Sequence, residues 1–263
     1  MDFGLKGRTA IVAAASSGLG KATALELAAE GANVVINGRN EESLIKAAHD
    51  IQSATGAEVL LITGDVTIET DIIQLVQESK NRFGRIDIMI TNAGGPPAGF
   101  FDDFDAEHYR QAVELNLIST INLCRAAVPH MRAQRWGRIV AITSIAAKQP
   151  VENLILSNTA RAGVLGFMKS LSQQVATDGI TVNSLCPGYH LTERLETLGS
   201  LTAEREGIPV EEVYARWAAS TSIRRIGDPR EFAAAAAFLC SDRASYVTGT
   251  VIQVDGGASK GLM

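Results

Sequence analysis

The sequence contains few of the residues that cross-link a chain or bind metals. Only three cysteines and four histidines occur among its 263 residues. The cysteines, Cys124, Cys186 and Cys240, lie far apart, and no CxxC pair, HxH or HxxxH spacing is present. Disulfide frameworks and zinc sites require such closely spaced sets. We therefore expect three reduced, mostly buried thiols and no bound metal.

An excess of positive charge and long apolar runs are also missing. The net charge is −5 at pH 7, whereas nucleic-acid-binding surfaces carry clustered Lys and Arg. The first ten residues, MDFGLKGRTA, hold no apolar stretch of signal-peptide length. The most apolar run, FAAAAAFLC, is far shorter than the ~20 residues of a membrane helix. We expect a cytoplasmic protein without nucleic-acid or membrane partners.

Short apolar runs alternate with longer amphipathic stretches along the chain. Each run is β-branched or aliphatic for about five residues and then stops at Gly, Asn, Asp or Pro. The runs occupy residues 9–15, 33–37, 58–65, 86–95, 138–144, 180–188 and 250–257. Runs that are apolar on both faces are typical of strands covered by helices on either side. This alternation predicts an α/β fold with a parallel sheet, in a single domain spanning residues 1–263.

One of the intervening stretches, GKATALELAAEG, predicts a helix. Its apolar spacing places Leu25, Ala28 and Ala29 on one face, and Gly31 follows as a C-terminal stop.

The alternation breaks once, between Pro187 and Asp228. About forty residues there contain no strand candidate, only polar helical pieces such as VEEVYARWAAS. Long insertions are uncommon unless they are functional, and ligands of open α/β sheets lie outside the carboxyl ends of the strands. We therefore expect the insertion at about residues 189–227 to act as a substrate loop.

A glycine-containing turn, AAASSGLG at residues 13–20, connects the first strand to the first helix. Gly18 and Gly20 permit a close approach of backbone to ligand, and the N-terminus of the helix favours an anion. The turn therefore predicts a phosphate site, although small residues also allow a helix to pack tightly on a sheet. Ser16 and Ser17 add hydroxyl groups for the phosphates.

The end of the second strand, INGRN, lacks the acidic residue with which dinucleotide folds often hold the adenine ribose. Arg39 stands there instead, and its planar fork of donors suits a 2′-phosphate. A solvated surface arginine is the alternative. The pattern favours NADP(H) over NAD(H).

These features resemble the short-chain dehydrogenase/reductase family, whose TGxxxGxG turn is similar to AAASSGLG. The resemblance continues in register along nearly the whole chain, and most closely follows the 3-oxoacyl-acyl-carrier-protein reductase-like branch. The matching segments are Asp65-Val66, TNAGG at 91–95, Asn116, Ser144, CPG at 186–188, Thr192 and VTGTVIQVDGG at 247–257.

The resemblance implies a single Rossmann domain with a doubly wound, seven-stranded parallel sheet, usually in a homotetramer, with a homodimer as the alternative. It implies hydride transfer between NADP(H) and a small carbonyl or alcohol substrate. The cofactor-binding residues implied are Ala14, Ser16, Ser17, Gly18, Leu19, Gly20, Arg39, Asp65, Val66, Asn92, Ala93, Gly94, Arg161, Pro187, Gly188 and Thr192, and the catalytic ones are Asn116, Ser144, Ser157 and Arg161.

The sequence departs from the family in its glycine turn. Ala13 and Ala14 replace the family's threonine and first glycine. A methyl group at Ala14 is tolerated at little cost only where the backbone is extended. Alanine is the smallest possible intrusion, so we expect dinucleotide binding to survive, with a weaker affinity as the alternative.

A second departure concerns the family's YxxxK motif. Thirteen residues after Ser144 stands Ser157 in place of the tyrosine, and Arg161 replaces the lysine. In the family the tyrosine transfers the proton, the lysine holds the nicotinamide ribose and lowers the phenol pKa, the serine orients the substrate oxygen, and the asparagine supports a water. Arg161 can supply the charge and the donors, but a guanidinium with a pKa above ~12 does not readily pass a proton. Ser157 is far less acidic than a tyrosine, which titrates near ~10.

Three explanations for the altered motif stay open. In the first, Ser144 and Ser157 hold a water that relays the proton while Arg161 stabilises the developing alkoxide. In the second, Tyr189 or His190 supplies the proton, although both residues also suit an ordinary loop. In the third, the chain binds NADP(H) without turnover, as a sensor or scaffold.

Residues 107–134 predict one long helix, broken only near Pro129. The resemblance implies that this helix pairs with the helix containing Ser157 in a neighbouring subunit. Packing within its own chain is the alternative.

Overall fold

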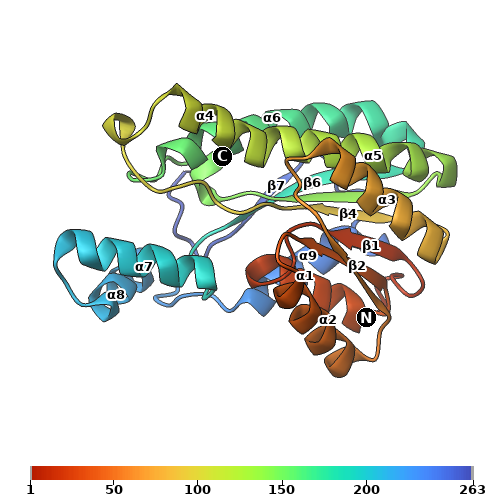
Figure 1. The fold of residues 1–263 in the computed structure, drawn as a ribbon, viewed down its shortest axis with the longest axis horizontal. Helices are drawn as coiled ribbons and strands as arrows, with labels where there is room; N and C mark the ends of the chain where they lie inside the picture. Colours follow the sequence, from red (N-terminus) through yellow and green to blue (C-terminus); the bar gives the residue numbers. More distant parts are fainter. Residues whose placement is uncertain (1, 262–263) are drawn as a thin grey trace.

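Each of the apolar runs forms a strand in the computed structural model, which describes residues 2–261 (Figure 1). All strands join one sheet in the order β3-β2-β1-β4-β5-β6-β7, and every neighbouring pair is parallel. The predicted single-domain Rossmann fold with a seven-stranded parallel sheet is thus confirmed. The strands are β1 Thr9–Val12, β2 Asn33–Gly38, β3 Val59–Thr63, β4 Ile88–Thr91, β5 Gly137–Ile142, β6 Ile180–Pro187 and β7 Val251–Val254.

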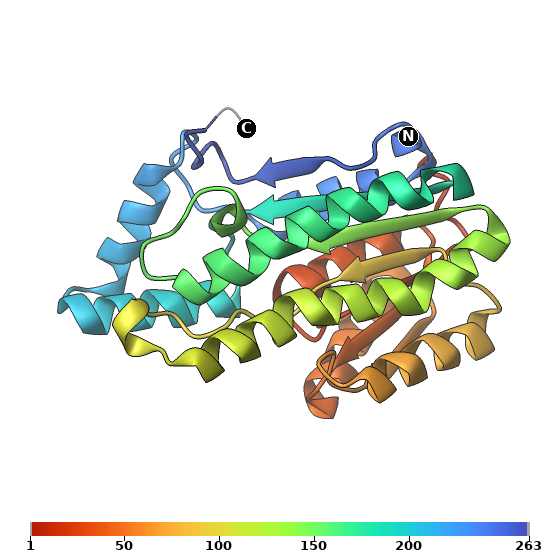
Figure 2. The same cartoon turned by 90° about the horizontal axis from the view of Figure 1, so that it is seen from above.

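Helices cover both faces of this sheet. Helices α3, α5 and α6 pack on one face and α1, α2 and α9 on the other, whereas α7 and α8 lie beyond the carboxyl ends of the strands (Figures 1 and 2). Their bounds are α1 Gly18–Ala29, α2 Glu41–Thr55, α3 Glu69–Phe83, α4 Ala106–Val113, α5 Ser119–Gln134, α6 Ile155–Val175, α7 Glu193–Glu206, α8 Val210–Ser220 and α9 Pro229–Cys240.

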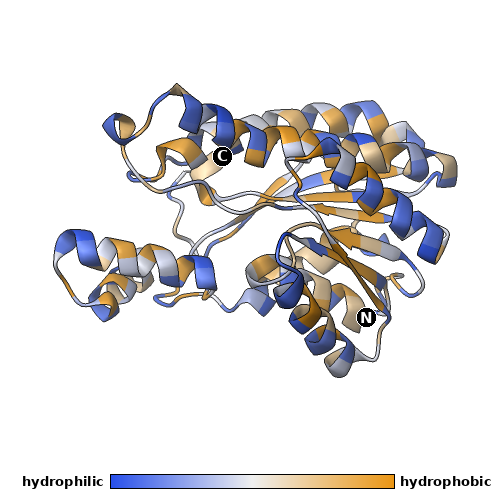
Figure 3. Cartoon of the chain, in the orientation of Figure 1, coloured by the Kyte–Doolittle hydropathy of each residue, from blue (hydrophilic) through white to orange (hydrophobic). Residues whose placement is uncertain are grey.

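The core has two halves, one on each face of the sheet. Strands β1, β4, β5 and β6 are buried along their whole length because helices cover both of their faces. Figure 3 shows the corresponding hydropathy, with apolar residues along the strands and hydrophilic ones on the outer sides of the helices. Removal of this apolar surface from water supplies the main free energy of folding.

Helix α1 begins and ends close to the predicted positions, with Gly31 in the left-handed region at φ 87°. The predicted buried face is partly wrong. Ala28 is buried, but Ala29 is exposed, and Leu27 and Ala24 face the core instead. The face is rotated because α1 packs against α9 as well as against the sheet.

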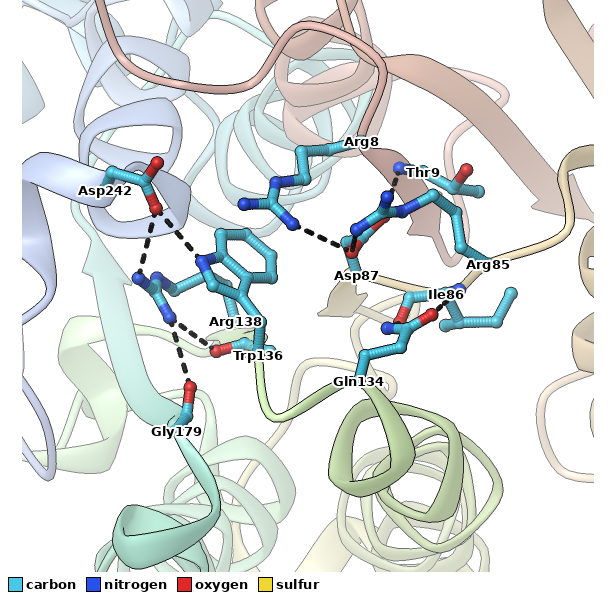
Figure 4. A network of polar contacts seen from close by, with 11 residues as sticks. Arg8, Thr9, Arg85, Ile86, Asp87, Gln134, Trp136, Arg138, Gly179 and Asp242 are labelled. Carbon is cyan, nitrogen blue, oxygen red and sulfur yellow. Dashed lines mark hydrogen bonds and ion pairs between the residues drawn. The ribbon is translucent and has the colours of Figure 1, made fainter.

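Polar contacts fix the amino edge of the sheet, opposite the carboxyl ends of the strands (Figure 4). Asp87 is fully buried and accepts bonds from Arg85 Nε at 2.5 Å and Arg85 Nη2 at 2.6 Å, with Arg8 at 3.5 Å. The Trp136 ring lies between the guanidinium groups of Arg8 and Arg138, at 3.8 and 4.3 Å from its centroid. A buried carboxylate needs such partners. The N–H of Thr9 also donates to Asp87 at 2.8 Å, so these contacts join the start of β1 to the start of β4.

The three cysteines are buried and free, in agreement with the expected thiols. Burial raises the pKa of Cys124 and of Cys240 to about 12, so both remain protonated at neutral pH. Among residues 2–261, none of the helices is both long enough and apolar enough to span a bilayer.

Candidate active site

A cavity of about 890 Å³ opens at the carboxyl edge of the sheet, where α7 and α8 stand beyond the strand ends. Its walls come from the turns after β1 to β6 and from α6, α7 and α8. Every predicted site residue except Asn116 lines it. Residues far apart in the sequence meet here because the carboxyl ends of parallel strands share one edge.

The turn after β1 approaches α1 so closely that only glycine fits at one position. A Cβ on Gly20 would lie 2.4 Å from the carbonyl oxygen of Ala14 and 2.9 Å from Nδ2 of Asn92. The N-cap residue, Ser17, makes no side-chain capping bond, so the first N–H groups of α1 remain available to an anion. Gly18 has φ 57°, which favours glycine.

The condition for a low-cost methyl group at Ala14, an extended backbone, is not met. Ala14 lies in the left-handed region, with φ 46°. Nδ2 of Asn92 donates to the carbonyl oxygens of Ala13 at 3.2 Å and of Ala14 at 3.1 Å. The close packing of α1 over the same carbonyl also fixes the turn. The neighbours therefore impose a glycine conformation on a residue that carries a methyl group.

The part of the cavity next to β2 and β3 carries a nearly free arginine. Arg39 at the end of β2 is 77% exposed and reaches Asp65 only at 3.9 Å. Asp65 is held instead by Thr67, whose N–H and Oγ1 donate to it at 2.9 and 2.8 Å. Asn37, which sequence reasoning noted only for its lack of charge, is buried and links β2 to β3 through bonds to Ile62 and Gly64.

Asn116 lies behind the cavity rather than on its wall. Its Nδ2 donates to the carbonyl oxygen of Gly94 at 3.0 Å, and its buried Oδ1 has no partner within residues 2–261. It occupies a π-helical turn, Glu114–Ile118, between α4 and α5. The helix predicted for residues 107–134 is therefore continuous, with this π-helical turn inside it. The break expected near Pro129 is wrong, because α5 runs through Pro129 to Gln134. Such π-turns frequently occur at functional sites.

Ser144 and Ser157 bring two hydroxyl groups into the cavity from different elements. Ser144 follows β5, and its Oγ accepts the N–H of Ala146 at 3.0 Å. That bond uses an acceptor site of the hydroxyl and leaves its proton free for a ligand. Ser157 lies in the first turn of α6 and is only 6% exposed.

Arg161 lies one helical turn after Ser157 and is buried. Its Nη1 donates to the carbonyl oxygens of Ile142 at 3.2 Å and of Thr143 at 2.9 Å, at the end of β5. These bonds leave the Nε and Nη2 donors for a ligand. Burial, followed by repulsion from Arg194, lowers the pKa of Arg161 to about 10. The guanidinium is more acidic than the sequence suggested, yet it stays charged at neutral pH.

The insertion after β6 forms α7 and α8 and contains no strand. The Tyr189 ring stacks on Trp217 of α8, with centroids 5.2 Å apart and 9° between the planes. Tyr189, Leu195, Leu198 and Trp217 line the cavity. This part of the wall is apolar and aromatic, as a substrate pocket commonly is.

The two alternative proton donors also line the cavity. His190 is buried, with its ring edge-on to Phe232, and burial lowers its pKa. It is therefore neutral at pH 7. Burial raises the pKa of Tyr189, so this phenol keeps its proton. Neither shift produces an acid matched to neutral pH.

Arg194, in the first turn of α7, is a site residue that sequence reasoning missed. Its Nη2 donates to the carbonyl oxygen of Pro96 at 2.7 Å and so joins α7 to the turn after β4. Arg194 itself lines the cavity. A charged residue two positions after Thr192 was the only signal available in the sequence.

The chain is similar to a family model, to reductases of known function and to solved reductase structures. A family model described as enoyl-(acyl carrier protein) reductase matches residues 13–259. The chain is 32% identical to the NADPH-dependent reductase BacG of Bacillus subtilis, over 97% of this chain and 99% of the relative. It is 34% identical to the 3-oxoacyl-[acyl-carrier-protein] reductase FabG of Chlamydia muridarum, over 98% and 99%.

Among solved structures, L-sorbose reductase from Gluconobacter frateurii, in complex with NADPH and L-sorbose, superimposes with a TM-score of 0.95. It is 32% identical, and the match covers 100% of both chains.

Proposed function

The chain belongs to the short-chain dehydrogenase/reductase family, and from this premise we propose that its carboxyl-edge cavity transfers hydride between NADP(H) and a small carbonyl or alcohol substrate. The family match and the NADPH-dependent relatives support this reaction class and this cofactor. The observation that carries the proposal is the joining, in one cavity, of a glycine turn, Arg39, Ser144 and Arg161.

The residues present fit a phosphorylated dinucleotide. The crowded contact at Gly20 and the open N-terminus of α1 form a cradle for the pyrophosphate. Arg39, which is 77% exposed and reaches Asp65 only at 3.9 Å, suits the 2′-phosphate. Asp65 and Asn92 border the adenine and central parts of the same cavity. Asn116 acts indirectly, by holding the carbonyl group of Gly94.

When bound, the nicotinamide supplies or accepts the hydride. We propose that Ser144, which already accepts the N–H of Ala146, donates its proton in a hydrogen bond to the substrate oxygen. Arg161 places a fixed positive charge beside the oxygen on which negative charge develops during reduction. Solvent delivers the proton through the hydroxyl groups of Ser144 and Ser157, which stands in for the family's tyrosine.

The proposed roles of Arg161 also include a structural one. Its two bonds to carbonyl oxygens at the end of β5 fix the segment from which Ser144 emerges. An arginine can hold both carbonyl oxygens through a single nitrogen and keep other donors free. Arginine in place of the family's lysine therefore keeps the positive charge and also anchors the segment at the end of β5. The hydroxyl groups of Ser144 and Ser157 then carry out the proton transfer.

The test follows NADPH absorbance with a panel of ketones, β-keto esters and quinones. We expect oxidation above the substrate-free background, and a loss of about 10- to 100-fold in the Ser144→Ala variant, which lacks one hydrogen bond to the reacting oxygen. A control variant, Arg82→Gln on α3, lies outside the cavity and keeps the wild-type rate. Tight NADPH binding with no turnover of any substrate would instead indicate a sensor or scaffold.

We further propose a cytoplasmic homo-oligomer, a tetramer or a dimer. Its expected interface is the face formed by α4, α5 and α6, as the family resemblance implies. Light scattering on the purified protein gives the mass in solution. A monomer at micromolar concentration would contradict this assembly without affecting the proposed reaction.

A further inference from the structure

We propose that the substrate carries a carboxylate and that Arg194 binds it. This inference rests on the proposed function, because it assigns the class of substrate that the same cavity accepts. The substrate is then an oxo acid or the corresponding hydroxy acid, with its carbonyl group at Ser144 and Ser157 and its carboxylate at α7.

The guanidinium of Arg194 is held in place before any ligand binds. Its Nη2 donates to the carbonyl oxygen of Pro96 at 2.7 Å. A Cβ on Gly95 would lie 2.9 Å from Nη2 and 3.0 Å from Nε, so the guanidinium lies directly against the backbone of Gly95. Any larger residue at that position would displace it. A positioned guanidinium loses less entropy when it binds a carboxylate than a free side chain does.

Arg194 and Arg161 have no carboxylate partner among residues 2–261. Neither forms an ion pair within 4.0 Å, whereas other arginines of this region do. Arg205 and Arg216 contact Glu206, and Arg225 contacts Glu231. Two unneutralised cations therefore face one cavity. An anionic ligand would relieve the repulsion between them and satisfy their free donors.

Acidic residues on the cavity wall do not supply this neutralisation. Within residues 2–261, Glu152 is exposed and makes no ion pair, and Glu206 is engaged by Arg205 and Arg216. Asp65 lies with Arg39 at the adenine end. The substrate end thus keeps a local excess of positive charge, although the whole chain is acidic at −5. Such local focusing of charge selects anions.

The remainder of the pocket defines the rest of the substrate. The stacked rings of Tyr189 and Trp217, together with Leu195 and Leu198, offer an apolar wall beside Arg194. A carbon chain or small ring fits this wall. The geometry therefore selects an oxo acid with an apolar body.

The test is calorimetry on the full-length protein saturated with NADP⁺, which measures binding without turnover. The probes are alpha-, beta- and gamma-oxo acids with short alkyl chains, each beside its methyl ester. We expect at least one acid to bind about 10- to 100-fold more tightly than its ester, as for a hydrogen bond to a charged group. Arg194→Gln removes this difference by weakening the acid alone, and Arg194→Lys retains part of it.

A matched control is Arg230→Gln, because Arg230 is 78% exposed, pairs with Asp228 and lies outside the cavity. This variant keeps the preference for the acid. Equal affinity for acid and ester, or no binding of either, would overturn the proposal. So would an Arg194→Gln variant that weakens NADPH to the same extent as the acid, since Arg194 would then serve a cofactor phosphate. Intact binding of the acid without NADPH oxidation would reject the proposed reaction and leave this site standing.

Discussion

Replacing Ala14 by glycine should stabilise the protein, in contrast to most changes of alanine to glycine. Ala14 has φ 46°, in the region where a Cβ approaches its own carbonyl group. An alanine there costs about 1–2 kcal/mol. Glycine loses about 0.5–1 kcal/mol more conformational entropy on folding. The balance predicts a gain of about 1 kcal/mol in the free energy of unfolding.

A gain of this size corresponds to an increase of about 2–4 °C in Tm for a chain of this length. Urea unfolding and calorimetry measure it. The matched control is Ala13→Gly, one residue earlier, where the alanine is fully buried and φ is not positive. That variant should lose about 1.5 kcal/mol, because it gains backbone entropy in the unfolded state and loses a buried methyl group.

The reasoning would be refuted if Ala14→Gly were no more stable than the wild type while Ala13→Gly lost stability as expected. The same variant bears on the cofactor, because Ala14 lines the cavity. Without the methyl group the turn has more room for a pyrophosphate. The Kd for NADPH should therefore fall, as measured by fluorescence titration.

Three further variants examine the cofactor and the reaction. Arg39→Ala should weaken NADPH by about 10- to 100-fold and NADH little, because only NADPH carries the 2′-phosphate; equal losses in the two titrations would remove that role. Gly20→Ala should abolish binding of both cofactors and lower Tm, because its Cβ would lie 2.4 Å from a carbonyl oxygen; unchanged NADPH affinity would contradict the cradle. Ser157→Tyr combined with Arg161→Lys should raise kcat with a simple ketone by about 10²-fold or more, by restoring a positioned acid; no gain in the NADPH assay would mean that the pocket has been rebuilt around the serine and arginine.

The sheet was predictable because strand runs buried on both faces have an unambiguous apolar pattern. The runs at residues 33–37 and 180–188, for example, agree with β2 and β6 to within one residue. The buried face of α1 was not predictable, because its many alanines and leucines allow several apolar faces. The helix that packs against it, α9, also lies about two hundred residues later in the sequence.

Most of the candidate site could be located from turn residues that follow strands. The backbone conformations and side-chain contacts within the site could not be predicted in this way. The left-handed backbone of Ala14 results from contacts with Asn92 and α1, which local sequence does not reveal. The π-helical turn at Asn116 was not predicted either, because Pro129 was the residue expected to break this helix. Arg194 stands out only once α7 is seen to face the turn at Pro96.

The chain has two tryptophans, and the fold places them at opposite ends of the strands. Trp217 is stacked in the cavity wall, and Trp136 is clamped between arginines at the far edge. Each indole therefore reports on a different event. Emission from a Trp136→Phe variant should follow ligand docking, whereas emission from a Trp217→Phe variant should change only when the whole sheet comes apart.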